Sequence, residues 1–198
     1  GCNLRCWFCD SYHTSWEPTH ATMSVEEIVA EVESHDADHV VLTGGEPLLH
    51  DASVALLEEL DARGYHTTVE TNGTIYRDAP IDLASVSPKL ASSTPTPDEN
   101  PRPDGKPTDA DEWAERHDER RIDLVEDAAL VESYDFQLKF VVSDRADVTE
   151  ATDLLDRLRD AAAVEIRDTD VLLMPEGATK ERVAETRPVT AELAREFG

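Results

Sequence analysis

The only three cysteines of this 198-residue chain lie within its first nine residues, in the stretch GCNLRCWFC. Cys2, Cys6 and Cys9 have the spacing Cys-x3-Cys-x2-Cys. Three thiols on one loop can bind an iron–sulfur cluster, and because a four-iron cluster normally takes four thiolates, one iron is left open for a reaction. The spacing therefore favours a cluster that does chemistry.

Other uses of these thiols fit less well. A disulfide framework is disfavoured because the number of cysteines is odd. A structural zinc ion needs four ligands, and although His13 could be the fourth, such sites usually take their ligands as two pairs from two loops. Three incidental buried cysteines are not expected to gather in one short polar stretch. Zinc remains the main alternative.

A second motif that can do chemistry is Thr43-Gly44-Gly45-Glu46, which follows a short apolar run. Two glycines let a ligand approach the backbone, and a carboxylate accepts hydrogen bonds from an ammonium group. An ordinary turn is the alternative. Polar or Gly/Pro residues also follow four other apolar runs, at 70–73, 87–89, 143 and 174–177.

The segments that carry these residues alternate between strand and helix patterns. Strands are predicted within 38–47, 65–74, 81–89, 136–143 and 170–177, and helices within 23–34, 53–64, 121–133, 146–162 and 178–197. The first helix begins with a Ser24–Glu27 capping box, Gly64 is placed to end the second, and the last is expected to break at Pro188. In the fourth helix, Ala151, Leu154, Leu155 and Leu158 are predicted to face inward. This alternation predicts a parallel sheet with its ligands at the carboxyl ends of the strands.

Residues 91–121 differ from the rest because they are rich in Pro, Asp and Thr and almost free of aliphatic residues. We interpret them as an exposed, partly disordered insertion within one domain that covers residues 1–198. The chain does not begin with Met and stops within a helical pattern, so both ends are expected to be cut.

The charge is strongly negative, with 44 acidic against 18 basic side chains and a net charge of -26. Such a field disfavours binding to nucleic acid or anionic membranes. The acids are spread along the chain, which favours a halophilic source over an acidic surface for a basic partner. A rare Lys is then expected to bind a specific anion. No apolar run approaches the roughly 18 residues of a membrane span and no signal peptide is recognisable, so the protein is predicted to be cytoplasmic.

Six motifs in order, GCNLRCWFCDS, LTGGEPLL, VETNGT, VSPKL, LKFVV and LMPEG, resemble the 7-carboxy-7-deazaguanine synthase family of the radical S-adenosylmethionine (SAM) superfamily. The resemblance implies a shortened parallel β/α barrel and a homodimer. It also implies that SAM chelates the open iron and, on reduction by a donor such as flavodoxin or ferredoxin, yields a 5′-deoxyadenosyl radical. The reaction implied is conversion of 6-carboxy-5,6,7,8-tetrahydropterin to 7-carboxy-7-deazaguanine with loss of ammonia. The product feeds queuosine or archaeosine in tRNA, and the halophilic composition favours archaeosine.

The resemblance also implies roles for individual residues. Cys2, Cys6 and Cys9 hold the cluster, Thr43 contacts the pterin, and Ser11, where the family usually has Thr, binds Mg2+. The SAM contacts implied are Phe8, Cys9, Asp10, Gly45, Glu46, Ser87, Pro88, Lys89 and Ser143. Ser11 could instead cap a loop and Lys89 could form a surface ion pair. Glu70, Asn72 and Lys139 have either binding or structural roles.

One feature departs from the family pattern. Family members carry pterin-binding residues, including an Arg, upstream of the cysteine loop, and this chain lacks that segment. We therefore expect the chain to hold the cluster and SAM more readily than the pterin. Two other functions stay open at this point, a glycyl-radical activating protein of the same superfamily and a non-catalytic, metal-stabilised binding module.

Overall fold

A computed structural model describes residues 1–19, 21–98 and 109–197. Its centre is one five-stranded sheet in the order β1-β2-β3-β4-β5, in which every neighbouring pair is parallel. The strands are β1 (His39–Leu42), β2 (His66–Thr71), β3 (Leu83–Val86), β4 (Asp135–Val142) and β5 (Val171–Pro175). The predicted α/β fold, a partial parallel barrel, is confirmed.

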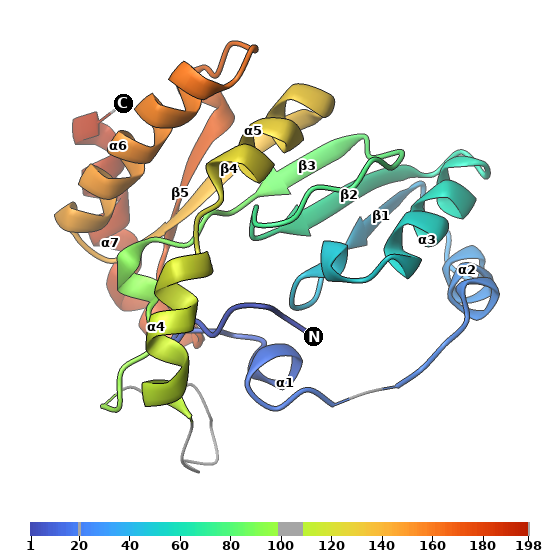
Figure 1. The fold of residues 1–198 in the computed structure, drawn as a ribbon, viewed down its shortest axis with the longest axis horizontal. Coiled ribbons are helices and arrows are strands. Elements are labelled where there is room, and N and C mark those ends of the chain that lie inside the picture. The colour runs from blue at the N-terminus through green and yellow to red at the C-terminus, as the bar shows by residue number, and fades with distance from the viewer. Residues whose placement is uncertain (20, 99–108, 198) are drawn as a thin grey trace.

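Five helices cover one face of this sheet. They are α2 (Val25–Glu33), α3 (Ala52–Asp61), α5 (Leu124–Ser133), α6 (Arg145–Ala161) and α7 (Lys180–Phe197). Helix α3 packs on β2, α5 on β3, α6 on β4 and α7 on β5, while α2 packs on α3. The cysteine loop, the short α1 (Tyr12–Ser15) and α4 (Ala110–Arg120) lie together near the carboxyl ends of the strands (Figure 1). The predicted functional residues are therefore gathered at one end of the sheet.

Strand β4 shows how the sequence divides core from site. Leu138, Phe140 and Val142 are buried in the main hydrophobic core, while the alternate residues Lys139 and Val141 face the opposite side and line a cavity. Successive side chains of a strand point to opposite faces, so one strand serves both regions. Each fully buried apolar side chain stabilises the fold by about 1.5–3 kcal/mol.

The helix signals in the sequence are confirmed. The Ser24 hydroxyl accepts from the Glu27 amide at 3.2 Å, and the Glu27 carboxylate accepts from the Ser24 amide at 2.7 Å. Gly64, with φ of 81°, follows the end of α3. The four residues of α6 that were predicted to face inward are buried: Ala151, Leu154, Leu155 and Leu158.

Helix α7 corrects one prediction, because it continues through Pro188 without a break. Proline removes the hydrogen bond to the carbonyl four residues earlier, here that of Ala184. Both Pro188 and Ala184 are exposed, so water can bind the carbonyl that has lost its donor. The Thr186 hydroxyl on the buried side of the same turn donates to the Glu176 carbonyl at 2.6 Å and ties the helix to the end of β5.

Within the part that the structure describes, most residues of the segment 91–121 are exposed or half-buried, but the segment also contains regular structure and a few buried residues. It begins with a short 3-10 turn, Ala91–Ser93, and ends with the 11-residue helix α4. Ser93, Ala110 and His117 are buried. The segment was predicted to be exposed because it is almost free of aliphatic residues. The polar side chains of Ser93 and His117 are nevertheless buried, and they are hydrogen-bonded to each other. Residues 99–108 of this segment lie outside the described residues.

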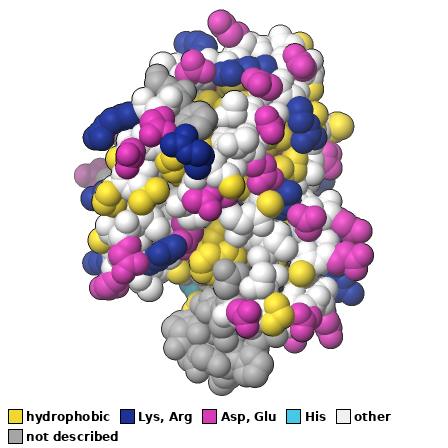
Figure 2. Space-filling view, turned by 90° about the vertical axis from the view of Figure 1, so that its left-hand side faces the viewer, with side chains coloured by type: hydrophobic (Ala, Val, Ile, Leu, Met, Phe, Trp, Pro, Cys, Tyr) yellow, Lys and Arg dark blue, Asp and Glu magenta, His cyan; other side chains and the backbone are white. Residues whose placement is uncertain are grey.

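Acidic side chains are dispersed over the surface. Figure 2 shows Asp and Glu scattered across one face, interspersed with Lys, Arg and apolar side chains. No helix within the described ranges has both the length and the apolar character to cross a membrane.

Candidate active site

A cavity of about 430 Å³ opens between the cysteine loop and the carboxyl ends of the strands. It brings together segments from most of the chain: the cysteine loop, the Gly-Gly turn after β1, and residues of β2, β3, β4 and β5. Its lining includes these predicted site residues: Cys2, Cys6, Phe8, Cys9, Asp10, Ser11, Thr43, Gly45, Ser87 and Lys89. Glu70, Asn72 and Lys139 also line it.

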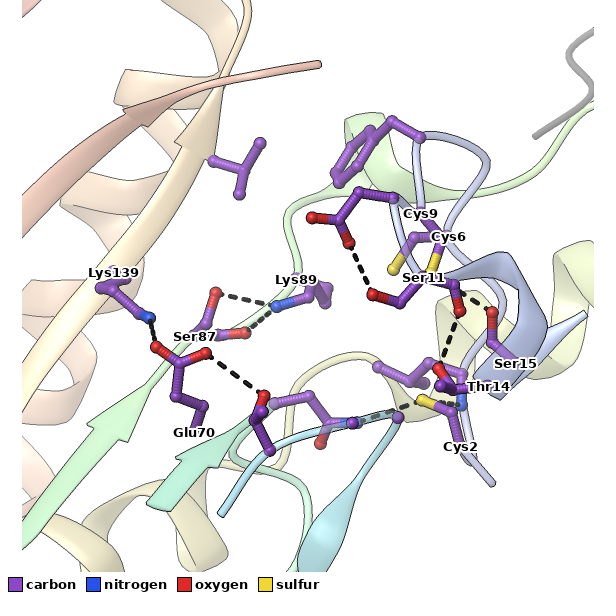
Figure 3. A pocket seen from close by; sticks show the side chains of 18 of the residues that line it. Cys2, Cys6, Cys9, Ser11, Thr14, Ser15, Glu70, Ser87, Lys89 and Lys139 are labelled. Atoms are coloured by element: carbon purple, nitrogen blue, oxygen red, sulfur yellow. Dashed lines mark hydrogen bonds and ion pairs between the residues drawn. The ribbon is translucent and has the colours of Figure 1, made fainter. Parts of the chain in front are cut away.

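The thiols are held by hydrogen bonds from nearby polar groups (Figure 3). The Leu4 amide donates to Cys2 Sγ at 3.4 Å, and the Ser15 hydroxyl donates to Cys9 Sγ at 3.3 Å. Burial raises the pKa of the Cys6 thiol to about 12 and also raises the pKa of Cys2. These two thiols therefore stay protonated at neutral pH until a metal replaces the proton.

The donor set fits an iron–sulfur cluster. Three thiols that belong to no disulfide, Cys2, Cys6 and Cys9, line one cavity. Thiolates are the ligands that iron–sulfur clusters take, each on its own iron. Across residues 1–19, 21–98 and 109–197, no group of three or more His, Cys, Asp or Glu is gathered closely enough to hold a metal ion, so the fit rests on the type of the three donors and on the cavity that they share.

The absence of a side chain at Gly45 lets the Gly-Gly turn contact the first two residues of the chain. A Cβ at Gly45 would lie 2.3 Å from the Gly1 carbonyl oxygen and 2.8 Å from Cys2 Cβ. The next amide, that of Glu46, donates to the same Gly1 carbonyl at 2.9 Å. Gly44 has φ of 137°, a conformation that favours glycine. The two glycines thus position the backbone next to Cys2.

Glu46, which was predicted to contact SAM, does not line the cavity, and the contact stays a prediction. The side chain is 1% exposed and points into the protein. Its carboxylate accepts hydrogen bonds from the Leu48 amide at 3.0 Å and the Asn72 amide at 2.7 Å, and also from the Thr71 hydroxyl. A buried carboxylate needs several donors to offset its lost hydration, and the turn supplies them. Glu46 therefore fastens the Gly-Gly turn to the end of β2.

Two cationic side chains face the cavity. The Lys139 ammonium lies 2.8 Å from Glu70 Oε1, and Thr43 Oγ1 donates to Glu70 Oε2 at 3.3 Å. The hydrogen bond from Lys139 lowers the pKa of the Glu70 carboxyl. The Lys89 ammonium donates to the carbonyl and the hydroxyl of Ser87 at 2.5 and 2.8 Å. Figure 3 shows Lys89 between the thiols and the Glu70–Lys139 pair.

Ser11 is placed beside the thiols. Its hydroxyl donates to Asp10 Oδ1 at 3.1 Å, and its carbonyl accepts from the amide and the hydroxyl of Thr14, each at 2.8 Å. The hydroxyl oxygen keeps a lone pair for a cation.

Two further predicted residues lie outside the cavity. Pro88 is not part of its lining, although both neighbours, Ser87 and Lys89, are. Ser143 does not line it either, because its amide and hydroxyl donate to Asp147 Oδ2 at 2.7 and 2.8 Å at the start of α6. Local capping explains Ser143 as well as a ligand contact would.

Several lining residues were not predicted from the sequence. Ser85 and Val141 were missed because they lie inside strands, where only the alternation of facing residues could have indicated them. Thr14 and Ser15 were missed because no pattern marked the α1 turn as part of the site.

The comparisons agree with this geometry. The sequence profile of the Radical SAM superfamily matches residues 1–92. A 7-carboxy-7-deazaguanine synthase from Halobacterium salinarum is 64% identical over 199 aligned positions, which cover 100% of this chain and 75% of the relative. A second, from Rhodopirellula baltica, is 38% identical over 189 positions, or 95% of this chain and 67% of the relative.

Solved structures share the fold. QueE from Escherichia coli has a TM-score of 0.60 at 22% identity, covering 100% of this chain and 79% of that one. TYW1 with a lysine-pyruvate adduct has a TM-score of 0.59 at 14% identity, covering 100% and 70%. At these identities the likeness concerns the arrangement of strands and helices.

Proposed function

Since this chain belongs to the 7-carboxy-7-deazaguanine synthase family of radical SAM enzymes, we propose that it converts 6-carboxy-5,6,7,8-tetrahydropterin to 7-carboxy-7-deazaguanine with loss of ammonia. The observation that carries this is the single cavity lined by the three thiols, the Gly-Gly turn and the polar strand ends, in a chain 64% identical to such a synthase. The class of enzyme is a lyase that breaks a carbon–nitrogen bond.

On the cluster side of the cavity, the cysteines would bind the cluster and the neighbouring residues would position SAM. Cys2, Cys6 and Cys9 would hold a four-iron cluster and leave one iron for SAM. When bound and reduced by one electron from the proposed donor, the cluster and SAM would supply the radical chemistry that starts at C6 of the pterin. Gly45 keeps the turn close to Cys2, and Lys89 would offer its ammonium to the SAM carboxylate.

Further SAM contacts follow from the same lining. Phe8 and Asp10 extend from the cysteine loop into the cavity, and Ser87 lies opposite, at the end of β3. In this proposal Phe8 packs on the cofactor, while Asp10 and Ser87 accept or donate hydrogen bonds. Lys89 is oriented for its role by Ser87, which accepts two of its hydrogen bonds.

The pterin would lie at the other side, against the strand ends. Thr43 is the proposed contact, and its hydroxyl is oriented by Glu70, which Lys139 holds in turn. The side chain of Lys139 is 13% exposed, and its ammonium pairs with Glu70 in the lining of the cavity. This placement suits a substrate that carries a carboxylate.

We further propose that Ser11 binds Mg2+, whose charge would favour binding of the substrate carboxylate. A hard cation of this kind prefers oxygen ligands and commonly takes few from the protein. The Ser11 hydroxyl lines the cavity next to the thiols, which supports the assignment.

The metal assignment is tested by Ser11→Ala. The variant should cleave SAM on reduction as the unmodified chain does, but should turn over the pterin at least about tenfold more slowly and lose its response to added Mg2+. Cys6→Ala is the matched variant that should abolish SAM cleavage itself. If Ser11→Ala keeps the Mg2+ dependence of the unmodified chain, the assignment is wrong.

The proposal extends to partners. The enzyme acts on a small molecule, and we propose a homodimer, a flavodoxin or ferredoxin as electron donor, and archaeosine as the destination of the product. The strongly acidic surface supports a high-salt environment, in which repulsion between charges is screened within about 3 Å at 1 M salt.

The decisive experiment is incubation of the full-length protein, anaerobically reconstituted and reduced, with the carboxy-tetrahydropterin, SAM and Mg2+ in high salt. Formation of the deazaguanine, seen by ultraviolet absorbance and mass, supports the proposal. A protein that holds its cluster and cleaves SAM but forms no deazaguanine would contradict it.

A further inference from the structure

A buried histidine far along the chain contacts the cysteine loop. The amide of Arg5 donates to Nδ1 of His117 at 3.0 Å, and Nε2 of His117 lies 2.9 Å from Oγ of Ser93. His117 and Ser93 are both fully buried. The imidazole therefore joins the cysteine loop, helix α4 and the turn after β3 inside the protein.

The direction of each hydrogen bond in this group is fixed. Because Nδ1 of His117 accepts from Arg5, the proton of the neutral ring is on Nε2, which donates to Ser93 Oγ. The Ser93 hydroxyl in turn donates to the Leu90 carbonyl at 2.6 Å. Burial lowers the pKa of His117 to about 4, so the ring is neutral at physiological pH. Each donor then has one acceptor.

Other contacts fix the same loop to the same segment. The Trp7 indole donates to the Ser92 carbonyl at 2.6 Å, and the Trp7 amide donates to the Ser93 carbonyl at 3.2 Å. The Arg5 guanidinium lies 4.1 Å from the ring centroid of Trp113, within the range of a cation–π contact. The cysteine loop is thus held to residues 92–93 by two hydrogen bonds and to α4 by a cation–π contact.

The far end of α4 reaches the opposite wall of the cavity. The Arg121 guanidinium donates to the Lys89 carbonyl at 3.1 Å and to Glu150 at 2.6 Å. Residues 90–98 and 109–121 therefore contact both the loop that bears the thiols and the residue proposed to bind SAM. Helix α4 lies beyond residues 1–92, which the superfamily profile matches.

We propose that His117 is a positioning residue for the iron–sulfur cluster, which it serves by holding the Arg5 amide and with it the loop between Cys2 and Cys6. Removal of this acceptor leaves the half-buried Arg5 amide without its partner and lets the loop open. The inference rests on the cluster of the proposed function but not on the identity of the substrate.

The first test uses the metal-free protein and amide hydrogen exchange. His117→Leu removes both ring nitrogens at similar volume, whereas His117→Asn can keep an acceptor near the position of Nδ1. We expect exchange at Arg5 and Trp7 to be about tenfold faster in His117→Leu and close to the original in His117→Asn. The control is Glu119→Gln on the exposed side of α4, which should change nothing.

The second test follows the cluster itself. After anaerobic reconstitution, His117→Leu should release iron to a chelator about tenfold faster and alter the electron paramagnetic resonance signal of the reduced cluster, with both properties restored in His117→Asn. A folded His117→Leu with unchanged exchange and iron release would overturn the proposal.

If His117→Leu does not fold, Ser93→Ala decides, because loss of the Nε2 acceptor favours movement of the ring proton to Nδ1, which then no longer accepts from the Arg5 amide. Faster exchange at Arg5 in Ser93→Ala supports the proposal and unchanged exchange overturns it. Deazaguanine formation by the unmodified chain is measured separately, so failure of the proposed reaction would not be mistaken for failure of this inference.

Discussion

The carboxyl group of Asp127 is buried beneath the turn that follows β2. The residue is 1% exposed, and neither carboxyl oxygen has a hydrogen-bond partner within the described residues. Its Oδ1 lies so close to Gly73 that a Cβ there would be 2.0 Å away. Burial, with a smaller contribution from Asp123, raises the pKa of Asp127 well above 3.8. The group is held in its protonated form by the fold.

Asp127→Asn should therefore stabilise the protein increasingly as pH rises. The unfolded chain releases the proton near the ordinary pKa of 3.8, whereas the folded chain keeps it to higher pH. Above the unfolded pKa the folded state binds more protons, so this residue lowers the free energy of unfolding by up to about 1.4 kcal/mol per pH unit until the folded pKa is passed. Asparagine has nearly the same shape and no such dependence.

The measurement is denaturant unfolding of Asp127→Asn and the unmodified chain in constant high salt from pH 4 to 8. The difference in the free energy of unfolding should grow with pH in favour of the variant. A difference that is constant over this range would mean that Asp127 does not titrate with folding.

Helix α6 begins at a cap that contains a predicted cofactor contact. The Asp144 side chain accepts from the Ala146 and Asp147 amides at 2.8 and 3.2 Å, and Asp147 accepts from Ser143. Side-chain acceptors at a helix start satisfy amides that have no partner within the helix.

We expect Ser143→Ala to act on this helix rather than on cofactor binding. Loss of the hydroxyl donor to Asp147 should reduce the free energy of unfolding by about 1 kcal/mol, while the dissociation constant of SAM stays the same. Thermal unfolding and SAM titration of the reconstituted protein measure the two effects. Weaker SAM binding at an unchanged free energy of unfolding would instead support the predicted contact between Ser143 and SAM.

The order of strands and helices was predictable because it depends on local signals. Apolar periodicity, the Ser24 cap and Gly64 each act within a few residues, and the structure confirms them. The burial of His117 was not predictable, because a lone histidine among acidic residues gives no sign of it. The burial of Glu46 was not predictable for a related reason: the motif indicates a carboxylate near the site but not the direction in which the side chain points.

At the scale of the whole molecule, the net charge of -26 makes the folded state depend on salt. A compact chain brings its acidic side chains closer together than an unfolded chain does, so their repulsion opposes folding. Added salt shortens the screening length from about 10 Å at 0.1 M to about 3 Å at 1 M.

The melting temperature should therefore rise between 0.1 and 1 M KCl. A gain of about 2 kcal/mol corresponds to about 4–8 °C for a chain of this size. Circular dichroism melts across a KCl series measure it, with a neutral osmolyte as the control for effects other than screening. A melting temperature that is flat or falls with KCl would show that repulsion does not limit stability.

The distance along the chain between Arg5 and His117 has a consequence during protein synthesis. The two residues are 112 positions apart, and ribosomes add about 5–20 residues per second, so the histidine is made roughly 5–20 s after the thiols. Throughout that interval the nascent loop lacks the hydrogen bond between the Arg5 amide and His117. The thiols are then open to oxidants and stray metals, and delivery of iron has to wait until the later segment has emerged and folded.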